Sequence, residues 1–239
     1  MSDQSNPVTP METRQVPLSK MRKAIARMTT ASMQTAPHFY SQIEIDMLPA
    51  KNAVNQLRER YPDIKISLLH LLVKVCAATL HAHPRLNASL DGETIVYNGE
   101  VNIGIVVALE DGMLIPVVHA ADLTPLPELA ARTIDLVDRA RRQRTTADDL
   151  LNGTFTISNM GKEGPDSFTS IIRSPQSAIL SLGTVSERPF VRQGQLVVAP
   201  TMIATLGVDH RVVDGAHAAG FLLTFKQLLE NPELSTLYG

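Results

Sequence analysis

Apolar residues recur at helical spacing in several stretches of the chain. Between Leu18 and Gln34, the residues Met21, Ile25 and Met28 share one face, because positions three and four apart lie one above the other on a helix. The same spacing predicts four further helices, over Leu48–Tyr61, Ile66–His83, Leu126–Arg144 and Gly215–Leu229. A proline follows three of the five predicted helices, and proline cannot continue a helix.

Short apolar runs between turn residues predict the strands. Asn98-Gly99 and the turn at 110–112 separate three of them, and a Gly-rich loop over Asn159–Gly164 follows another. Because helices and strands mix without regular alternation, the order predicts a mixed sheet with helices packed on one side, in a single domain. The predicted strands are His38–Met47, Thr94–Tyr97, Val101–Leu109, Met113–Val118, Thr154–Ser158, Ser177–Thr184 and Leu196–Val208.

Composition suits a packed globular domain. The 239 residues are 44% hydrophobic and 19% charged, and a net charge of −2 gives no field that favours nucleic acid or an anionic membrane. The longest apolar stretch, Ile66–Ala82, is interrupted by polar residues and is too polar to span a bilayer. The polar residues 1–15 predict a disordered tail without the pattern of a signal peptide, which favours a cytoplasmic location.

The single cysteine, Cys76, lies on the apolar face of a predicted helix, and a buried core thiol is the favoured interpretation. His70, His81 and His83 do not have the spacing of a metal site, so no metal is expected.

Basic residues surround two of the predicted helices. Those of the first helix suit either contacts with a phosphate group or a solvated face. Those at the end of Leu126–Arg144 need no ligand, because cations are favourable at a helix C-terminus. The two sets are Lys20, Arg22, Lys23 and Arg27, and Arg139, Arg141, Arg142 and Arg144.

The most informative chemistry lies between the last predicted strand and the last predicted helix. His210 stands at this turn, where a histidine can take a proton from a thiol or hydroxyl because it titrates near neutral pH. Asp214 can orient the turn, cap the helix or balance a buried cation. From these residues alone, a polar strand end followed by an N-cap remains an alternative.

Seven segments occur in an order that carries a family resemblance. Together they resemble the catalytic domain of the dihydrolipoamide acyltransferases of 2-oxoacid dehydrogenase complexes, with chloramphenicol acetyltransferase as a more distant relative. The resemblance covers roughly residues 16–237. The segments are Pro17–Arg27, Ala36–Tyr40, Asn102–Val107, Gly112–Val117, Gly153–Gly161, Pro175–Leu180 and Asp209–Gly215.

The resemblance implies an α/β fold, the two-layer sandwich of chloramphenicol acetyltransferase, over residues 16–239. It also implies direct acyl transfer between coenzyme A and an acceptor, with His210 as general base, Ser158 as hydrogen-bond donor to the oxyanion, and Asp214 holding the loop. Acetyl-coenzyme A would be a substrate, and no metal, lipoyl attachment site or covalent acyl-enzyme is expected. The family assembles as homotrimers with each site between two subunits, so His210 would face Ser158 of a neighbour.

Other residues of this channel follow from the same resemblance. Asn159 and Gly161 of the Gly-rich loop would line it, and so would Phe168 and Thr169 of a strand over Phe168–Ile172. Without the family, Ser158 would be interpreted as a polar strand-end residue bonded to its own loop.

Several residues depart from the family pattern, and the departures favour a particular acceptor. Met28 and Ala199 stand where the family commonly has Arg. His119 stands where it commonly has Lys or Arg, and Gly207 where it commonly has Ser or Thr. The end of the chain, Leu234–Gly239, is less apolar than the segments that join such trimers into shells, which favours a free trimer. A start at Met1 with a short polar tail favours a standalone O-acetyltransferase for a small-molecule hydroxyl, such as a hydroxymethyl tetronate of natural-product biosynthesis.

Two alternatives stay open. One is the dihydrolipoamide acetyltransferase core of a 2-oxoacid dehydrogenase complex, which moves an acyl group between a lipoamide thiol and coenzyme A. The remote one is a non-catalytic scaffold, which would have no need of His210 and Ser158. Neither nucleic acid nor a membrane is expected as a partner.

Overall fold

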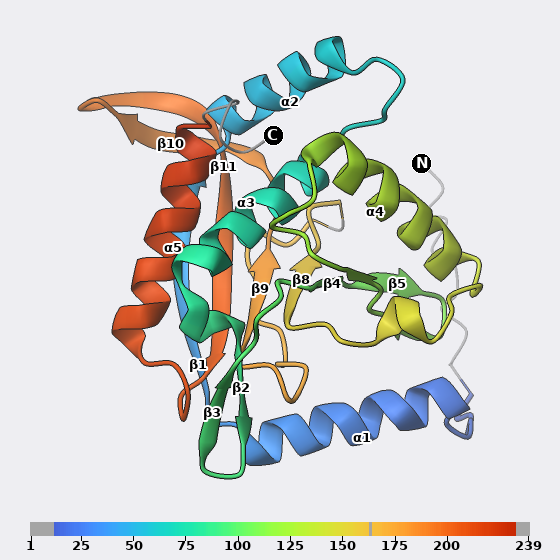
Figure 1. Ribbon diagram of the computed structural model, residues 1–239. Helices are drawn as coiled ribbons and strands as arrows, with labels where there is room; N and C mark the ends of the chain where they lie inside the picture. The colour runs from blue at the N-terminus through green and yellow to red at the C-terminus, as the bar shows by residue number, and fades with distance from the viewer. Residues whose placement is uncertain (1–11, 163, 233–239) are drawn as a thin grey trace, which may run out of the picture.

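Five helices of the computed structural model correspond to the five predicted from spacing (Figure 1). The structure describes residues 12–162 and 164–232, so most of the predicted tail and the chain end at 233–239 lie outside the described residues. The helices are α1 Lys20–Thr35, α2 Leu48–Arg60, α3 Leu68–Ala82, α4 Leu126–Arg141 and α5 Gly215–Glu230, with short 3-10 turns η1 Pro84–Asn87 and η2 Asp148–Leu150.

Local chemistry sets the helix ends. Ser19 caps α1 by accepting a hydrogen bond from the Arg22 N–H, and Asp214 caps α5 in the same way. The predicted end of α4 at Arg144 is wrong by three residues, because Gln143 adopts a left-handed conformation with φ of 54° and ends the helix.

The central sheet is mixed, as the order of elements predicts. Strands β4, β8 and β9 pair in parallel, whereas β1, β11, β10 and β7 join antiparallel. The order is β1-β11-β9-β8-β4-β7, with β10 also paired to β11. The strands are β1 His38–Asp46, β4 Ile103–Ile105, β7 Val117–Val118, β8 Phe155–Asn159, β9 Ala178–Leu182, β10 Ser186–Arg192 and β11 Gln195–Asp209.

Two hairpins lie outside this sheet, and they correct the predicted strands. Val101–Leu109 is wrong as one strand, because the backbone of Val106 turns to bond the Ile157 carbonyl at 3.0 Å. Met113–Val118 is also interrupted, at Pro116, which has no N–H for a strand ladder. The hairpins pair β2 Ala88–Asp91 with β3 Thr94–Tyr97, and β5 Val107–Leu109 with β6 Gly112–Leu114. Strands β2 and β10 were not predicted, because charged and polar residues such as Asp91, Glu187 and Arg188 interrupt their apolar pattern.

The predicted strand at Phe168–Ile172 is wrong. This segment has no regular secondary structure and pairs with no strand. Its backbone groups are instead bonded by side chains of α1 and β1, so a strand ladder is not needed to satisfy them.

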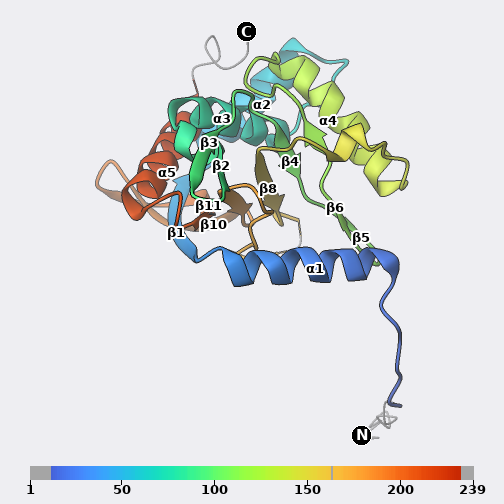
Figure 2. The same ribbon diagram turned by 60° about the horizontal axis from the view of Figure 1, so that its bottom comes forward.

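The hydrophobic core lies between one face of the sheet and the helices α3 and α5. Phe155 of β8 faces Phe221 of α5 with 5.8 Å between ring centroids. Cys76 of α3 is fully buried, and burial raises the pKa of its thiol, which confirms a core role. Figure 2 shows α2, α3, α4 and α5 gathered on one side of the sheet, with α1 apart from them on the other.

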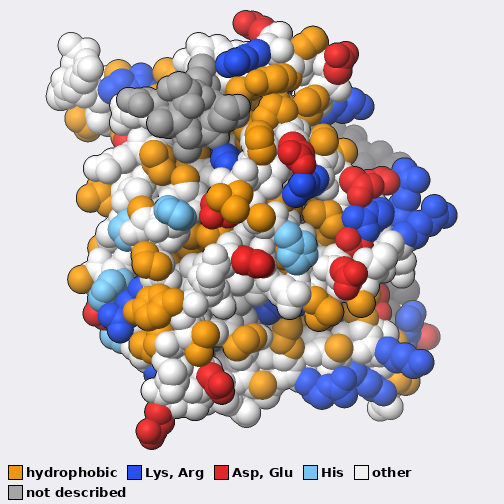
Figure 3. Space-filling model, in the orientation of Figure 1, with side chains coloured by type: hydrophobic (Ala, Val, Ile, Leu, Met, Phe, Trp, Pro, Cys, Tyr) orange, Lys and Arg blue, Asp and Glu red, His pale blue; other side chains and the backbone are white. Residues whose placement is uncertain are grey.

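The predicted basic face of α1 is exposed to solvent. Lys20, Arg22, Lys23 and Arg27 are all exposed. Figure 3 shows basic side chains at the lower right, in the region where Figure 1 draws α1. Met21 and Ile25 on the opposite face contact Gly112 of the β5–β6 hairpin. None of the described helices combines the length and the apolar character that a membrane crossing requires.

Candidate functional site

A row of polar side chains crosses the sheet on the face opposite the one that packs against α3 and α5. Ser158 of β8 is in register with Ser181 of β9, which is in register with Thr205 of β11 and then with Gln42 of β1. Residues in register on neighbouring strands point to the same face. The Gln42 side-chain amide donates to the Thr205 hydroxyl at 2.9 Å, so the row is partly hydrogen-bonded.

Ser158 also borders a pocket at the end of its strand. The pocket has a volume of about 610 Å³, and Ser158 is only 5% exposed. Leucines from the first turns of α3 form its apolar side, whereas Arg141 and Lys162 supply cations. The residues that line it include Ser67, Leu68, Leu69, Leu72, Ile105, Val107, Val137, Arg141, Asn159, Gly161, Lys162 and Val185.

The loop after β8 is shaped by two close contacts. The Asn159 side chain accepts a hydrogen bond from the Gly161 N–H at 2.9 Å, which holds the turn. At Gly183 an added Cβ would lie 2.0 Å from the Asp166 carbonyl oxygen, so the returning chain can cross only above a glycine. The predicted residues Asn159 and Gly161 therefore lie beside Ser158, and the pocket opens next to them.

His210 lies at the end of β11, where the sequence predicts it. Its backbone N–H donates to the Pro37 carbonyl at 2.9 Å, and its ring meets the Phe39 ring edge-on with 5.2 Å between centroids. The residue is exposed, and within residues 12–162 and 164–232 its ring has no hydrogen-bond partner. A ring held by an aromatic contact with both nitrogens free is suited to exchanging a proton with a substrate.

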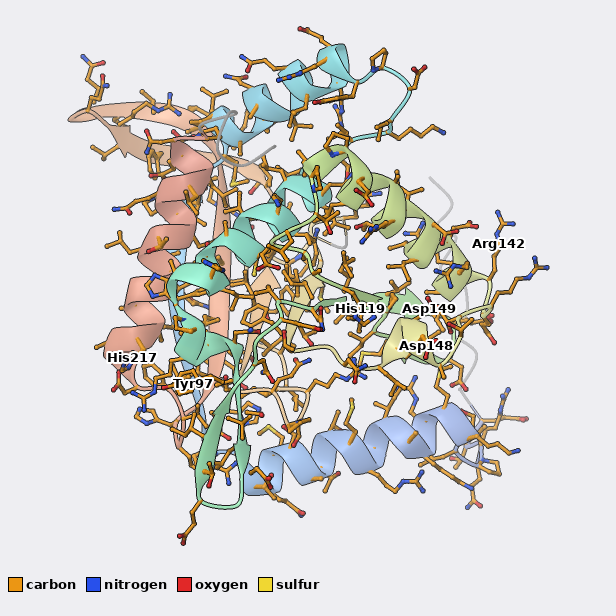
Figure 4. The ribbon with its side chains drawn as sticks, in the orientation of Figure 1. Tyr97, His119, Arg142, Asp148, Asp149 and His217 are labelled. Atoms are coloured by element: carbon orange, nitrogen blue, oxygen red, sulfur yellow. The ribbon has the colours of Figure 1, made fainter. Side chains whose placement is uncertain are left out.

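Asp214 contacts the helix that follows, not His210. One carboxylate oxygen accepts from the His217 N–H at 3.1 Å and from the His217 ring at 2.7 Å. The backbone hydrogen bond from His217, followed by the side-chain one, lowers the pKa of the Asp214 carboxyl. Figure 4 shows His217 at the start of α5. Of the three roles left open for Asp214, the structure shows the helix cap.

Within one chain, His210 and Ser158 lie far apart. Ser158 is level with Thr205 and two strands away from it, whereas His210 is five residues beyond Thr205 on β11. At about 3.3 Å per residue, this is a separation of about 16 Å along the strand. One chain alone therefore does not bring the two predicted catalytic groups together.

Phe168 and Thr169 are not among the residues that line the Ser158 pocket. Both lie in the irregular segment after the Gly-rich loop, with Phe168 half-buried and Thr169 exposed.

His119, one of the departures from the family pattern, borders a separate cavity of about 200 Å³. Its ring lies 3.3 Å from the Asp148 carbonyl, and Figure 4 shows it close to Asp148 and Asp149. The cations of this cavity are already paired: Arg139 bonds both Asp135 and Asp149.

The described part of the chain has no evident metal-binding site. Histidine, cysteine and carboxylate side chains form no group of three there that could hold an ion. His70 instead accepts the Ser67 N–H at the start of α3, and burial lowers its pKa to about 4.

Comparison with known proteins identifies the family. Residues 10–237 match the model of the 2-oxoacid dehydrogenases acyltransferase catalytic domain. The chain belongs to this acyltransferase family. It is 37% identical over 232 residues to the dihydrolipoyllysine-residue acetyltransferase component of the Rickettsia bellii pyruvate dehydrogenase complex, covering 96% of this chain and 56% of that protein. The chain thus spans about half the length of the curated relatives it matches.

Solved structures of this family have the same fold. The dihydrolipoamide acetyltransferase of Azotobacter vinelandii superposes with a TM-score of 0.89 at 30% identity, covering 97% of this chain and 99% of that one. Chloramphenicol acetyltransferase superposes with a TM-score of 0.55 at 14% identity, covering 85% and 94% of the two chains. The predicted chloramphenicol acetyltransferase-like α/β sandwich is therefore confirmed.

Several residues of the site were not found from the sequence. The first turns of α3 were predicted only as buried helix, and Arg141 was explained by the helix end alone. Both line the Ser158 pocket, as Lys162 does. The exposed Phe39, which follows Pro37-His38, carried a weak signal: an aromatic residue at the start of an edge strand, opposite the strand end that precedes His210.

Proposed function

We propose that this chain is an acyltransferase core that passes an acetyl group between the thiol of a dihydrolipoamide arm and coenzyme A. The observation that carries the proposal is the placement of His210 and Ser158. The first is an exposed imidazole at a strand-to-helix turn, and the second is a largely buried serine that borders a pocket of about 610 Å³. The relatives favour this acceptor, and the predicted small-molecule O-acetyltransferase finds no support among them.

The spacing of three residues supports their roles. Crystallographic and enzymatic work on the Azotobacter vinelandii enzyme addressed a serine, a histidine and an asparagine in its catalytic mechanism. In that chain the histidine follows the serine by 52 positions and the asparagine follows the histidine by four. Ser158, His210 and Asp214 have the same two separations, with aspartate in place of asparagine.

In the proposed reaction, His210 takes the proton from the attacking thiol as its sulfur adds to the thioester carbonyl carbon. The carbonyl π-electron pair moves onto oxygen, and the Ser158 hydroxyl donates a hydrogen bond to the oxyanion. Collapse re-forms the carbonyl and breaks the original carbon–sulfur bond, and the leaving sulfur takes the proton back from the imidazolium. Asp214 keeps the turn in place through its cap on α5.

The separation of about 16 Å along β11 supports a site in which the reacting pair comes from two copies of the chain. A closed ring of identical subunits gives every copy the same contact. We therefore propose a homotrimer in which His210 of one subunit faces Ser158 of the next. In such a ring every site is complete, whereas an isolated subunit has none.

The cations of the Ser158 pocket suit coenzyme A. Arg141 and Lys162 are exposed at its border, and guanidinium and ammonium groups bind phosphate oxygens. The apolar side formed by Leu68, Leu69 and Leu72 suits the uncharged part of a substrate arm. Asn159 and Gly161 would contact the arm near Ser158, and Phe168 and Thr169 would face it from the neighbouring segment.

Release of free coenzyme A from acetyl-coenzyme A, with dihydrolipoamide as acceptor, tests the proposal. We expect His210→Ala to lower turnover by at least about 100-fold, the usual loss on removing a general base. Ser158→Ala should lower the maximal rate by about 100-fold with less effect on binding, because its contact is strongest in the transition state. A loss below threefold in His210→Ala would refute the assignment, and transfer only to hydroxyl acceptors would restore the O-acetyltransferase.

Mixed assemblies test the interchain site directly. When the His210→Ala and Ser158→Ala chains are unfolded together in equal amounts and refolded, about a quarter of the sites in random trimers receive both native residues. Activity should recover to about a quarter of wild type. If the mixture stays as inactive as its parts while wild type refolds with full activity, the two residues act within one chain and the interchain site is wrong.

A further inference from the structure

The irregular segment Phe168–Ile172, here called the strap, is fixed by side chains from three other elements. Tyr40 of β1 donates its hydroxyl to the Ser170 carbonyl at 3.2 Å, and the Ile172 N–H donates to the His38 ring at 3.0 Å. Ser32 of α1 donates to the Ile172 carbonyl at 2.7 Å. A fourth bond, also 2.7 Å, joins the Ser170 hydroxyl to that of Ser181. These partners replace a strand ladder.

Two of the side chains that bond the strap, those of Ser32 and Ser181, are buried. Ser32 is fully buried and is the only buried residue within α1, although the rest of that helix is largely exposed. Ser181 is 1% exposed. A buried hydroxyl costs free energy unless it is hydrogen-bonded, so both serines are stabilised only while the strap is in place.

Local contacts orient the side chains of His38 and Tyr40 so that each forms its hydrogen bond with the strap. The His38 Nδ1 lies 2.7 Å from the Ala36 carbonyl and donates to it, so Nε2 is left as the acceptor for the Ile172 N–H. The Tyr40 ring lies against Gly207, where an added Cβ would be 2.9 Å from the ring. Because residue 207 has no side chain, the Tyr40 ring can pack over β11 at this point. This position of the ring brings its hydroxyl to the Ser170 carbonyl.

The strap lies next to Ser158 and presents other side chains outward. Ser181, which holds Ser170, is the register neighbour of Ser158 on the next strand. Residues alternate along an extended segment: Ser170 and Ile172 are bonded inward, whereas Thr169 is exposed and Ile171 is 40% exposed. A fixed surface of alternating side chains thus stands beside the serine.

The proposed function already places the strap along the substrate passage, as a wall in front of Ser158. We infer that His38 and Tyr40 are positioning residues, which hold this wall in one place through their hydrogen bonds to Ile172 and Ser170. The inference rests on the proposed acyl transfer. Contacts with a non-reacting part of the substrate are present in both the ground state and the transition state, so their loss raises KM more than it lowers kcat.

Four variants separate this role from a general effect on stability. Tyr40→Phe removes one hydroxyl, and His38→Leu removes the acceptor for Ile172. His38→Gln restores an acceptor oxygen close to the position of Nε2. Tyr61→Phe, at the end of α2 and away from the strap, is the matched control. For each, we would measure kcat and KM for acetyl-coenzyme A and dihydrolipoamide, the Tm, and hydrogen exchange of the strap amides by mass spectrometry.

We expect His38→Leu and Tyr40→Phe to raise KM for at least one substrate by about fivefold or more, with kcat within about threefold, as the loss of uniform binding requires. Exchange of the strap amides should rise, His38→Gln should recover part of the loss, and Tyr61→Phe should match wild type. Faster exchange with both KM values unchanged would overturn the inference, as would kcat and Tm falling together without a change in KM.

An inactive wild-type enzyme would refute the proposed function separately. In that case coenzyme A binding by calorimetry decides on the strap. Weaker coenzyme A binding in His38→Leu but not in Tyr61→Phe would support the positioning role of His38, and equal binding in all variants would overturn it.

Discussion

Gly207 offers a stringent test of the packing around the strap. Here a Cβ at 207 would lie 2.9 and 3.2 Å from two carbons of the Tyr40 ring and 3.3 Å from Ile179. We therefore expect Gly207→Ala to destabilise this protein.

The magnitude follows from the size of the overlap. Carbon atoms in ordinary contact are about 3.5–4.0 Å apart, so the ring must move by about 0.6 Å or more. The hydrogen bond from Tyr40 to Ser170 resists this movement. Overpacking of this kind costs about 1–3 kcal/mol, and replacing a strand glycine returns about 0.5–1 kcal/mol, so a net loss of about 1–2 kcal/mol is expected.

Urea unfolding of a double-mutant cycle measures the effect. In a Tyr40→Ala background, Gly207→Ala should be neutral or stabilising, which gives a coupling of about 1 kcal/mol or more between the two positions. Gly99→Ala is the matched control, because an added Cβ there meets nothing within 4 Å. The reasoning is refuted if Gly207→Ala is as stable as Gly99→Ala in the wild-type background, or if the two substitutions at 40 and 207 are additive.

Three further predictions concern buried groups. Lys74→Met should cost about 2–4 kcal/mol in urea unfolding, because the Lys74 ammonium donates to the Asp122 and Thr124 carbonyls at 2.7 and 2.8 Å; unchanged stability would show that other donors reach them. The pKa of His70 is lowered to about 4, so the unfolded chain binds the proton more tightly between pH 4 and 6.5. Stability should therefore be full above about pH 6.5 and fall by about 3 kcal/mol as the pH drops through this window, and a His70→Gln variant should lack that part of the pH dependence. Cys76 is fully buried with a raised thiol pKa, so a thiol reagent should label it at least about 1,000-fold more slowly in the native protein than in urea; rapid native labelling would contradict its burial.

Most helices could be predicted from the sequence because their signals are local. The apolar spacing in α3 and the capping Asp214 of α5 depend on residues within a few turns of each other. The strap could not be predicted in this way. Its sequence, Phe168–Ile172, resembles that of a strand, and the residues that bond its backbone in place of a strand ladder, Ser32 and His38, are more than 130 positions away.

The two halves of the candidate site differ in the same respect. His210 could be proposed from its position between a strand and a helix, whereas Ser158 depended on the family resemblance. The pocket beside Ser158 is formed by segments distant in sequence, among them the start of α3 and the end of α4, so neither its apolar side nor the place of Arg141 could be predicted.

The register of the sheet also decides what a single subunit can do. Continuous pairing from β8 through β9 to β11 sets Ser158 level with Thr205, and β11 stays paired with β1 up to Asp209. A one-residue shift would turn every core side chain of a strand to the other face, so the register cannot slide to bring the groups closer. Side-chain rotation of His210 spans only a few ångströms of the separation. If His210 and Ser158 act on one substrate, the contact between subunits is therefore part of the active site itself, and a variant that dissociates the assembly should lose activity with every side chain of the site intact.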